Sequence, residues 1–392
     1  MIVRQFLQWQ RTASAAERAD ATSALARSYL HSDLSADDRA AVEGALIMAL
    51  DDPSPLVRSA LAQALAFSED SPPVVILALA ADQSEIASWV LEHSPLLVDA
   101  DLVDAVATGG PQAQAAIANR SPLPCTVAAA LAEVATAEAC LILIENTEAV
   151  IAPSSFSRLV ERHGHLGAIR EALLARDDLP VSARQALLAK LSELLAHFAV
   201  SRAWLEEDRA RRVAKEACEK ATVTLAAVSA EDEIPPLIRH LRESGQLTAG
   251  LVLRALLSGN VEMFEQALAN LSGLSLARVS ALVYDKSGGG LRALYDRAGL
   301  PASTYAAFSE ALAAMREGGF VGDFGAATRL RRRMVERVLT RCADEATLDI
   351  EPLLTLLRRF ATEAAREEAR TFCQDLAADD WIEPDAPMRA AA

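Results

Sequence analysis

Apolar residues recur in short blocks that are separated by Pro, Gly, Asp or Ser, and this pattern predicts helix after helix from residue 14 onward. Alternate blocks end alike, in LAFSED, VLEHSPLL, IANRSPLP, LIENTEAV and LLARDDLP. The residues at these ends, which we call anchors, are Phe67, His93, Arg120, Asn146 and Arg176, at steps of 26, 27, 26 and 30. A period near 27 fits two helices of about 10 residues with two turns. We therefore expect an all-α fold that begins with an α-solenoid of stacked helical hairpins.

One hairpin carries a more specific motif. The stretch ALDDPSPLVRSALAQALA (49–66) places Asp51 and Asp52 at a turn, followed by Val57 and Arg58. This arrangement resembles a HEAT repeat, in which an Asp-containing turn precedes a Val-Arg pair. Carboxylates near a helix N-terminus are favoured by the helix dipole, and Arg58 is expected to reach an acidic group on an adjacent repeat. The other hairpins keep the architecture but lack the pair, so the array is predicted to be HEAT-like.

The pattern changes near residue 180 and divides the chain. Residues 1–180 are predicted to form the repeat domain. Residues 181–234 are predicted to be a long connecting helix, continuous through the charged stretch WLEEDRARRVAKEACEK (204–220), followed by a linker. Residues 235–378 are predicted to form a second helical domain with shorter units and glycine stops such as Gly245, Gly259, Gly273 and Gly299. The tail, 379–392, has no periodicity and is predicted to be mobile.

A longer resemblance covers most of the chain. The stretch 245–301, GQLTAGLVLRALLSGNVEMFEQALANLSGLSLARVSALVYDKSGGGLRALYDRAGLP, is similar to a bacterial, chiefly alphaproteobacterial, family of unknown function. The segments LEHSPLLVDADLV and AIANRSPLP fit the same resemblance. It implies HEAT-like repeats in the N-terminal half, a helical C-terminal region and a cytoplasmic location. It implies no active-site residues.

Charge narrows the classes of partner. The formal net charge is −16, and residues 1–180 hold 11 Lys/Arg against 24 Asp/Glu. An acidic surface repels phosphate backbones, so nucleic acid is a disfavoured partner, whereas basic or amphipathic proteins suit it. The five cysteines form no C-x-x-C pair, and no apolar run reaches the roughly 20 residues of a membrane span. These features favour a cytoplasmic protein.

The best ligand candidate is the basic stretch RLRRRMVERVLTR (329–341). On a helix Arg329, Arg333, Arg337 and Arg341 share one face, and Arg332 lies beside them. Such a row could clamp a phosphate, a nucleotide or an acidic peptide, although a solvated face or pairing with the acidic N-terminal half is favoured. The glycine run at 288–290 is interpreted as a turn, with phosphate binding as the less favoured alternative. For His163 and His165 a metal site is disfavoured, because no third ligand is near in sequence.

No catalytic motif is present, so we assign no catalytic residue, metal or cofactor. The leading hypothesis is a non-enzymatic protein-interaction or regulatory scaffold, with His93, Arg120, Asn146 and Arg176 as candidate partner-contacting residues. The alternatives are a sensor of a phosphorylated small ligand through 329–341 and, with less support, an enzyme on a HEAT-like scaffold, for instance a base-excision enzyme. A homo-oligomer is left open.

Overall fold

The computed structural model describes Trp9 and residues 12–285, 289–318, 332, 334–341 and 351–379 of the 392-residue chain. The regular secondary-structure elements of these residues are all helices, which confirms the predicted all-α class. One isolated β-bridge joins Leu123 to Ala149. The chain divides into two compact units, Met1–Lys190 (unit 1) and Leu191–Ala392 (unit 2). This division falls within the predicted connecting segment 181–234.

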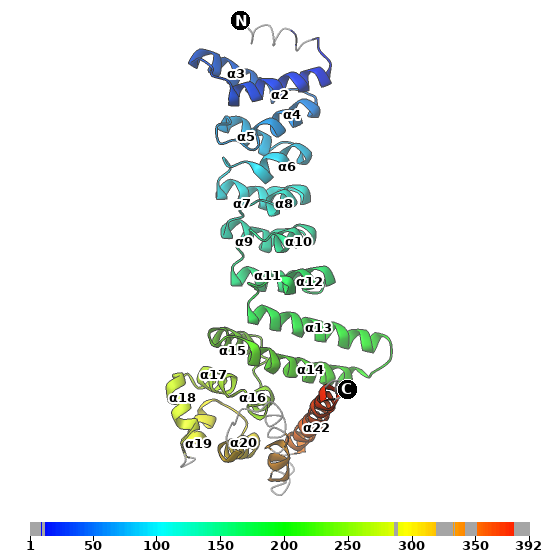
Figure 1. Ribbon diagram of the computed structural model, residues 1–392, viewed down its shortest axis with the longest axis vertical. Coiled ribbons are helices and arrows are strands. Elements are labelled where there is room, and N and C mark those ends of the chain that lie inside the picture. Colours follow the sequence, from blue (N-terminus) through cyan, green and yellow to red (C-terminus); the bar gives the residue numbers. More distant parts are fainter. Residues whose placement is uncertain are drawn as a thin grey trace, which may run out of the picture. The chain divides into compact units, whose positions relative to one another are not determined.

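Unit 1 is a two-layer stack of short antiparallel helices (Figure 1). Its helices are α2 (Ala15–His31), α3 (Ala36–Ala49), α4 (Pro55–Leu65), α5 (Pro73–Ala80), α6 (Ser84–His93), α7 (Asp99–Thr108), α8 (Pro111–Ala118), α9 (Cys125–Val134), α10 (Ala137–Glu145), α11 (Pro153–His163), α12 (Gly167–Ala175) and the first part of α13 (Val181–Ser201). In one layer α2, α4, α6, α8, α10 and α12 pack each on the next. In the other layer α3 packs on α5, and α7, α9 and α11 pack in succession.

The helix ends lie where the sequence repeat predicts them. Each anchor residue lies at or just after the C-terminal end of α4, α6, α8, α10 or α12. Four helices of the stack begin with proline at the first helical position, where its missing N–H costs nothing and its fixed φ suits the helix. The helices from α4 to α12 are 8 to 11 residues long, as the period requires.

A single hydrophobic core runs through unit 1, from Ala26 to Leu187. It is built almost wholly of Leu, Ile, Val and Ala, and Tyr29 and Phe156 are the aromatic residues buried in it. Because a two-helix hairpin covers only one side of this apolar strip, each repeat is stabilised by burying its strip against the next repeat.

The Asp-Arg motif links the first repeats in series. Arg58 donates from Nε to Asp82 Oδ2 at 2.6 Å and from Nη1 to the backbone oxygen of Asp52 at 2.6 Å. Arg18 in turn binds both carboxylate oxygens of Asp52, from Nε at 2.8 Å and from Nη2 at 2.9 Å. This confirms that Arg58 reaches an acidic group on the adjacent repeat. Arg18 and the neighbouring Arg58 hold the pKa of Asp52 below its ordinary value.

Unit 2 contains a buried helix, α16. The remainder of α13 is followed by α14 (Glu207–Val228), α15 (Ile234–Glu243), α16 (Ala249–Leu257), α17 (Val261–Ser272), α18 (Leu276–Val283), α19 (Gly289–Arg297), α20 (Tyr305–Gly318) and α22 (Glu351–Asp379), with further helical residues at 334–341. α16 packs on α14, α17 and α20, and all seven of its residues from Leu251 to Leu257 are buried. Four predicted glycine stops, Gly245, Gly259, Gly273 and Gly299, have φ of 69°, 79°, 70° and 69°, which confirms their role as helix stops.

The prediction of one continuous helix through 182–220 is wrong. α13 ends at Ser201, and α14 begins at Glu207. Between them Ala203 takes a positive φ of 55°, and Trp204 N–H bonds back to Ala199 O at 3.0 Å. The acidic residues that follow, Glu207 and Asp208, occupy the first turn of α14, where the helix dipole stabilises them.

The Arg58 contacts predict a clear difference between two arginines of unit 1. We expect Arg58→Met to lower the free energy of unfolding by about 2 kcal/mol, because Asp82 loses its cation and Asp52 O loses a donor. Arg158→Met, which removes exposed ion pairs to Glu133 and Glu161, should leave the urea midpoint unchanged. Urea unfolding followed by circular dichroism measures both. Equal midpoints for the two variants would contradict a structural role for the Asp-Arg series.

Candidate functional site

One edge of unit 1 collects the anchor residues, and we call it the helix-end edge. It is formed by the loops that follow the C-terminal ends of five helices, namely 66–72, 94–98, 119–124, 146–152 and 176–180. The last carbonyl groups of each helix have no partner within that helix, so such an edge needs external hydrogen-bond donors.

Three anchors supply those donors to the preceding repeat. Arg120 donates from Nη1 to Leu91 O at 2.6 Å and from Nη2 to Ser94 O at 2.8 Å, at the end of α6. Asn146 donates from Nδ2 to Ala118 O and Arg120 O at the end of α8, at 2.9 and 2.7 Å.

Arg176 continues the series at the end of α10. Its Nη1 donates to Ile144 O at 3.0 Å and to Asn146 O at 2.9 Å. These three anchors are therefore inter-repeat capping residues, and their contact with a partner stays a prediction.

The two N-terminal anchors are aromatic instead. The rings of Phe67 and His93 stack with centroids 4.4 Å apart, and Trp89 lies 6.2 Å from His93. Phe67 keeps 64% of its surface exposed. At the N-terminal end of the edge, an aromatic cluster that faces solvent thus stands where a guanidinium or amide group caps the helix ends farther along.

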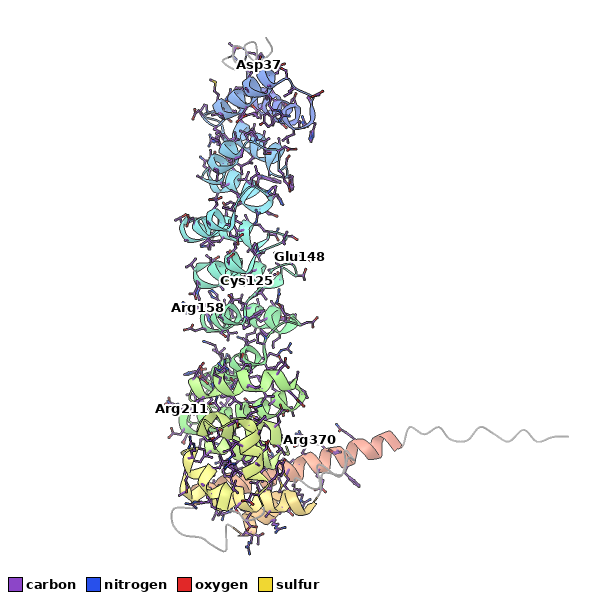
Figure 2. All side chains as sticks on the ribbon, turned by 90° about the vertical axis from the view of Figure 1, so that its left-hand side faces the viewer. Asp37, Cys125, Glu148, Arg158, Arg211 and Arg370 are labelled. Carbon is purple, nitrogen blue, oxygen red and sulfur yellow. The ribbon has the colours of Figure 1, made fainter. Side chains whose placement is uncertain are left out.

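The charge that the helix-end edge presents is negative. Its loops contain the acidic residues Glu69, Asp70, Glu148, Asp177 and Asp178 and no lysine. Their two arginines are the anchors that bind backbone carbonyls, and Arg176 also binds Asp178 at 2.7 Å. Figure 2 shows Glu148 projecting from this side of the stack, opposite to Arg158.

Apolar side chains lie between these carboxylates. Val98 and Val150 are 60% and 61% exposed, and they occupy two of the same loops. Exposed apolar residues next to unpaired charges of one sign are a common feature of surfaces that bind a complementary protein segment.

A groove of about 790 Å³ opens at the C-terminal end of this edge. It lies between the end of α10 and α12, and alanines at 168, 172 and 175 line it. The carboxylates that border it are those of Glu145, Glu171, Asp177 and Asp178. Within the described residues Glu145 and Asp177 form no ion pair, so both are available to a cation. We call this feature the acidic groove.

The arginine-rich stretch has a different environment. Arg332 binds Glu336 and Glu368 at 2.7 and 2.9 Å, and Arg341 lies 3.4 Å from Glu310. Arg337 lies 3.9 Å from Glu310. The sequence favours a solvated face or pairing with the acidic N-terminal half; the acidic partners of these arginines are instead glutamates of unit 2. Arg329 and Arg333 lie outside the described residues, as do residues 286–288 of the glycine run and residues 380–392 of the tail.

His163 is one of the two histidines considered from the sequence as metal ligands. His163 is the last residue of α11; burial lowers its pKa, and its Nε2 has no hydrogen-bond partner among the residues described. The described part of the chain holds no group of three or more His, Cys, Asp or Glu that could bind a metal ion. None of the described helices combines the length and apolar composition that a membrane span needs.

Arg254 is a buried charged residue that was not predicted from the sequence. It is the single charged residue in LVLRALL, and only 5% of its side chain is exposed. Its Nη1 donates to Glu363 Oε2 at 2.6 Å, and its guanidinium carbon lies 4.2 Å from the centroid of the Phe360 ring. A charged residue in an otherwise apolar helix is a signal that could have identified it, because such a residue requires partners when it is buried.

Glu219 on α14 is the second acidic neighbour of Arg254. Its Oε2 lies 3.9 Å from Arg254 Nε, and Thr248 donates a hydrogen bond to its Oε1 at 3.5 Å. Burial raises the pKa of the Glu219 carboxyl above its ordinary value, against the opposing effect of Lys215 and Arg254.

Comparison with known proteins finds one family. The family model described as "Uncharacterised protein conserved in bacteria (DUF2336)" matches residues 86–347, which is more than half of the chain. No curated protein and no solved structure matches the chain.

A substitution at Arg120 distinguishes a capping role within the stack from direct contact with a partner. We expect Arg120→Met to lower the free energy of unfolding by about 1–3 kcal/mol, because Leu91 O and Ser94 O lose their donors in a largely buried setting. Urea unfolding followed by circular dichroism measures this loss, with Asp177→Asn on the same edge as the variant that should retain the wild-type midpoint. A folded Arg120→Met protein of unchanged stability would instead favour direct partner contact.

The raised pKa of Glu219 predicts a pH dependence of stability. The folded protein binds this proton more tightly than the unfolded chain, so stability falls as the pH rises from 4.5 through the raised folded value. We expect hydrogen-exchange protection of α16 amides, corrected for intrinsic rates, to decrease over that range in the wild type. Glu219→Gln should remove this pH-dependent decrease in protection. If the variant keeps the wild-type pH profile, the decrease in protection does not come from Glu219.

Proposed function

We propose that this chain, which belongs to the bacterial family DUF2336, is a non-enzymatic scaffold that docks a basic, amphipathic segment of a partner protein on the helix-end edge of unit 1. In this proposal the stack is a HEAT-like array that acts in the cytoplasm. Helical stacks commonly bind partners along a surface to which successive repeats contribute.

The observation that carries the proposal is the separation of charge at the helix-end edge. Arg120 and Arg176 direct their guanidinium groups to backbone carbonyls inside the stack. The carboxylates of Glu145, Glu148 and Asp177 have no such internal partner among the described residues. The edge therefore presents hydrogen-bond acceptors and negative charge to a partner. Both attract lysine and arginine side chains, and the charge accelerates association.

The apolar residues of the edge favour an amphipathic partner over a purely basic one. Phe67, Val98 and Val150 would contact the apolar face of a docked segment, and its basic face would meet the carboxylates. The acidic groove suits a helix, because its floor of small alanine side chains allows a backbone to approach closely.

The two alternatives have less support. A phosphorylated ligand would have to displace carboxylates from Arg332 and Arg341, which already bind glutamates. A base-excision enzyme would need a basic groove, whereas the groove of unit 1 is bordered by four carboxylates.

A peptide-binding measurement tests the proposal. The probe is a fluorescein-labelled amphipathic helix of alternating Lys and Leu turns, about 18 residues long, and fluorescence anisotropy reports its binding. We expect binding at low salt that weakens as ionic strength rises, because the contacts are exposed ion pairs. A Glu/Leu peptide of the same pattern should not bind.

Two double variants of equal net charge locate the binding surface. Glu145→Gln/Asp177→Asn removes two carboxylates of the acidic groove and should weaken binding by about fivefold. Asp104→Asn/Glu138→Gln removes one exposed carboxylate near the middle of α7 and one in the first turn of α10, both outside the loops of the helix-end edge, and should leave affinity unchanged. Equal weakening by both variants, or no binding of the Lys/Leu peptide to folded protein, would overturn the proposal.

A further inference from the structure

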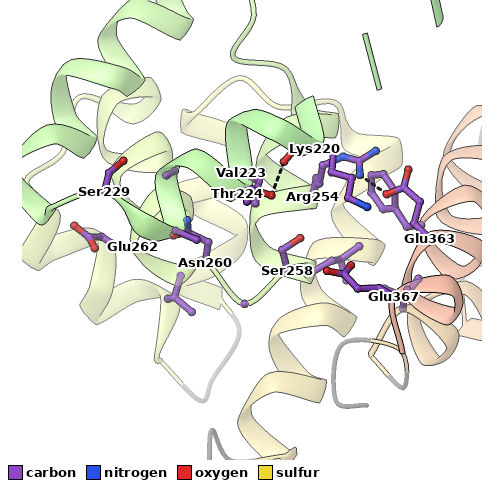
Figure 3. Close-up of a pocket in the computed structure, with 18 residues that line it drawn as sticks. Lys220, Val223, Thr224, Ser229, Arg254, Ser258, Asn260, Glu262, Glu363 and Glu367 are labelled. Atoms are coloured by element: carbon purple, nitrogen blue, oxygen red, sulfur yellow. Dashed lines mark hydrogen bonds and ion pairs between the residues drawn. The ribbon is translucent and has the colours of Figure 1, made fainter. Parts of the chain in front are cut away.

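A cavity of about 510 Å³ lies inside unit 2, apart from the helix-end edge. It is lined by the C-terminal half of α14, the end of α16, the turn into α17, Val335 and one face of α22 (Figure 3). This volume is within the range of sites that bind small metabolites. Its lining mixes apolar residues such as Leu257 and Phe360 with charged side chains.

Buried hydrogen-bond donors in this lining lack acceptors. Nε and Nη2 of Arg254 have no hydrogen-bond partner among the described residues, and the 3.9 Å from Nε to Glu219 is too long for a hydrogen bond. Nδ2 of Asn260 is also buried without a partner in the described part of the chain, although its Oδ1 caps α17 by accepting from Met263 N at 3.0 Å. Unpaired buried donors are costly, so a ligand that supplies acceptor oxygens would bind favourably here.

The cations at the cavity come from two helices. Lys220 of α14 and Arg254 of α16 both line it, and Figure 3 shows them at the end that Glu363 also borders. Two cationic side chains suit the carboxylate of a ligand, because charge-assisted hydrogen bonds are the strongest that side chains make.

The carboxylates that line the cavity determine which other charged group the ligand carries. Glu262, Glu363 and Glu367 also line the cavity, so the charged lining carries more carboxylates than cations. A dianionic phosphate would add to that excess. A ligand with one carboxylate and one ammonium group leaves the balance unchanged and can use both kinds of side chain.

We propose that this cavity binds a small zwitterion of the α-amino-acid class with an apolar side chain. The carboxylate of the ligand binds Lys220 and the unpartnered donors of Arg254. Its ammonium group binds Glu363 and Glu367, and its apolar side chain packs on Leu257 and Phe360.

Isothermal titration calorimetry of the full chain with four probes tests this ligand class. The probes are L-norleucine, hexanoate, hexylamine and inorganic phosphate, so that the first three share an unbranched carbon chain and differ in their charged groups. We expect norleucine to bind at least about tenfold more tightly than hexanoate or hexylamine, each of which lacks one charge-assisted contact. No saturable binding of norleucine, equal binding of all the probes, or preferred binding of phosphate would overturn the proposal.

A pair of lysine variants ties binding to the cavity. Lys220→Gln should weaken norleucine binding by about tenfold and leave hexylamine binding unchanged, because it removes a carboxylate contact. Lys215→Gln alters an exposed lysine of the same helix outside the cavity lining and should bind norleucine as the wild type does. Lys215 is exposed and Lys220 is half-buried, and circular dichroism checks that both variants fold. Equal affinities for the two variants would place the ligand elsewhere.

Discussion

Hydrogen bonds from side chains to the ends of neighbouring helices are the interaction on which this structure depends. Short helices leave a large share of their carbonyl groups unpaired, and the last turn also carries the negative end of the helix dipole. Arg120, Asn146 and Arg176 satisfy those groups in one layer of unit 1, and Arg162 does the same for Ala132 O and Ala135 O in the other. In unit 2 Arg297 donates to Ser272 O at the end of α17. Each bond fixes the position of one repeat on the next.

This use of arginine determines what the surface of unit 1 can do. Backbone carbonyls stabilise the Arg120 guanidinium without a carboxylate, and Arg176 binds one carboxylate, that of Asp178, in addition to its backbone carbonyls. Acidic residues in the same loops, such as Glu148 and Asp177, therefore have no cation inside the stack among the described residues. Stability and surface charge are linked through the same side chains, so a positively charged partner would find free carboxylates without breaking the contacts that hold the repeats together.

Local sequence predicts the features that depend on local chemistry. Helix ends follow from turn residues and capping, so the five anchors and the stop at Gly273 lie where the pattern places them. The sequence could not predict the break at Ala203, because it depends on one non-glycine residue adopting a positive φ. Nor could it pair Arg254 with Glu363, which lies 109 residues away on α22. The candidate edge was predicted as a row of positions, but the internal bonds of its side chains required the three-dimensional structure.

The two units illustrate opposite ways of neutralising a buried or half-buried arginine. In unit 1 burial lowers the pKa of Arg120, and the carbonyls of α6 stabilise its charge without adding a formal charge. In unit 2 Arg254 is neutralised by Glu363 and by the more distant Glu219, and neither carboxylate accepts from its Nε or Nη2. Neutralising the charge and satisfying the donors are separate requirements, because ion pairing acts at 3.9 Å whereas a hydrogen bond does not. Among the described residues Arg120 leaves its Nε unsatisfied, whereas Arg254, a residue that lines a cavity, leaves two nitrogens unsatisfied. That difference is why the structure favours a ligand at Arg254 and a packing role for Arg120.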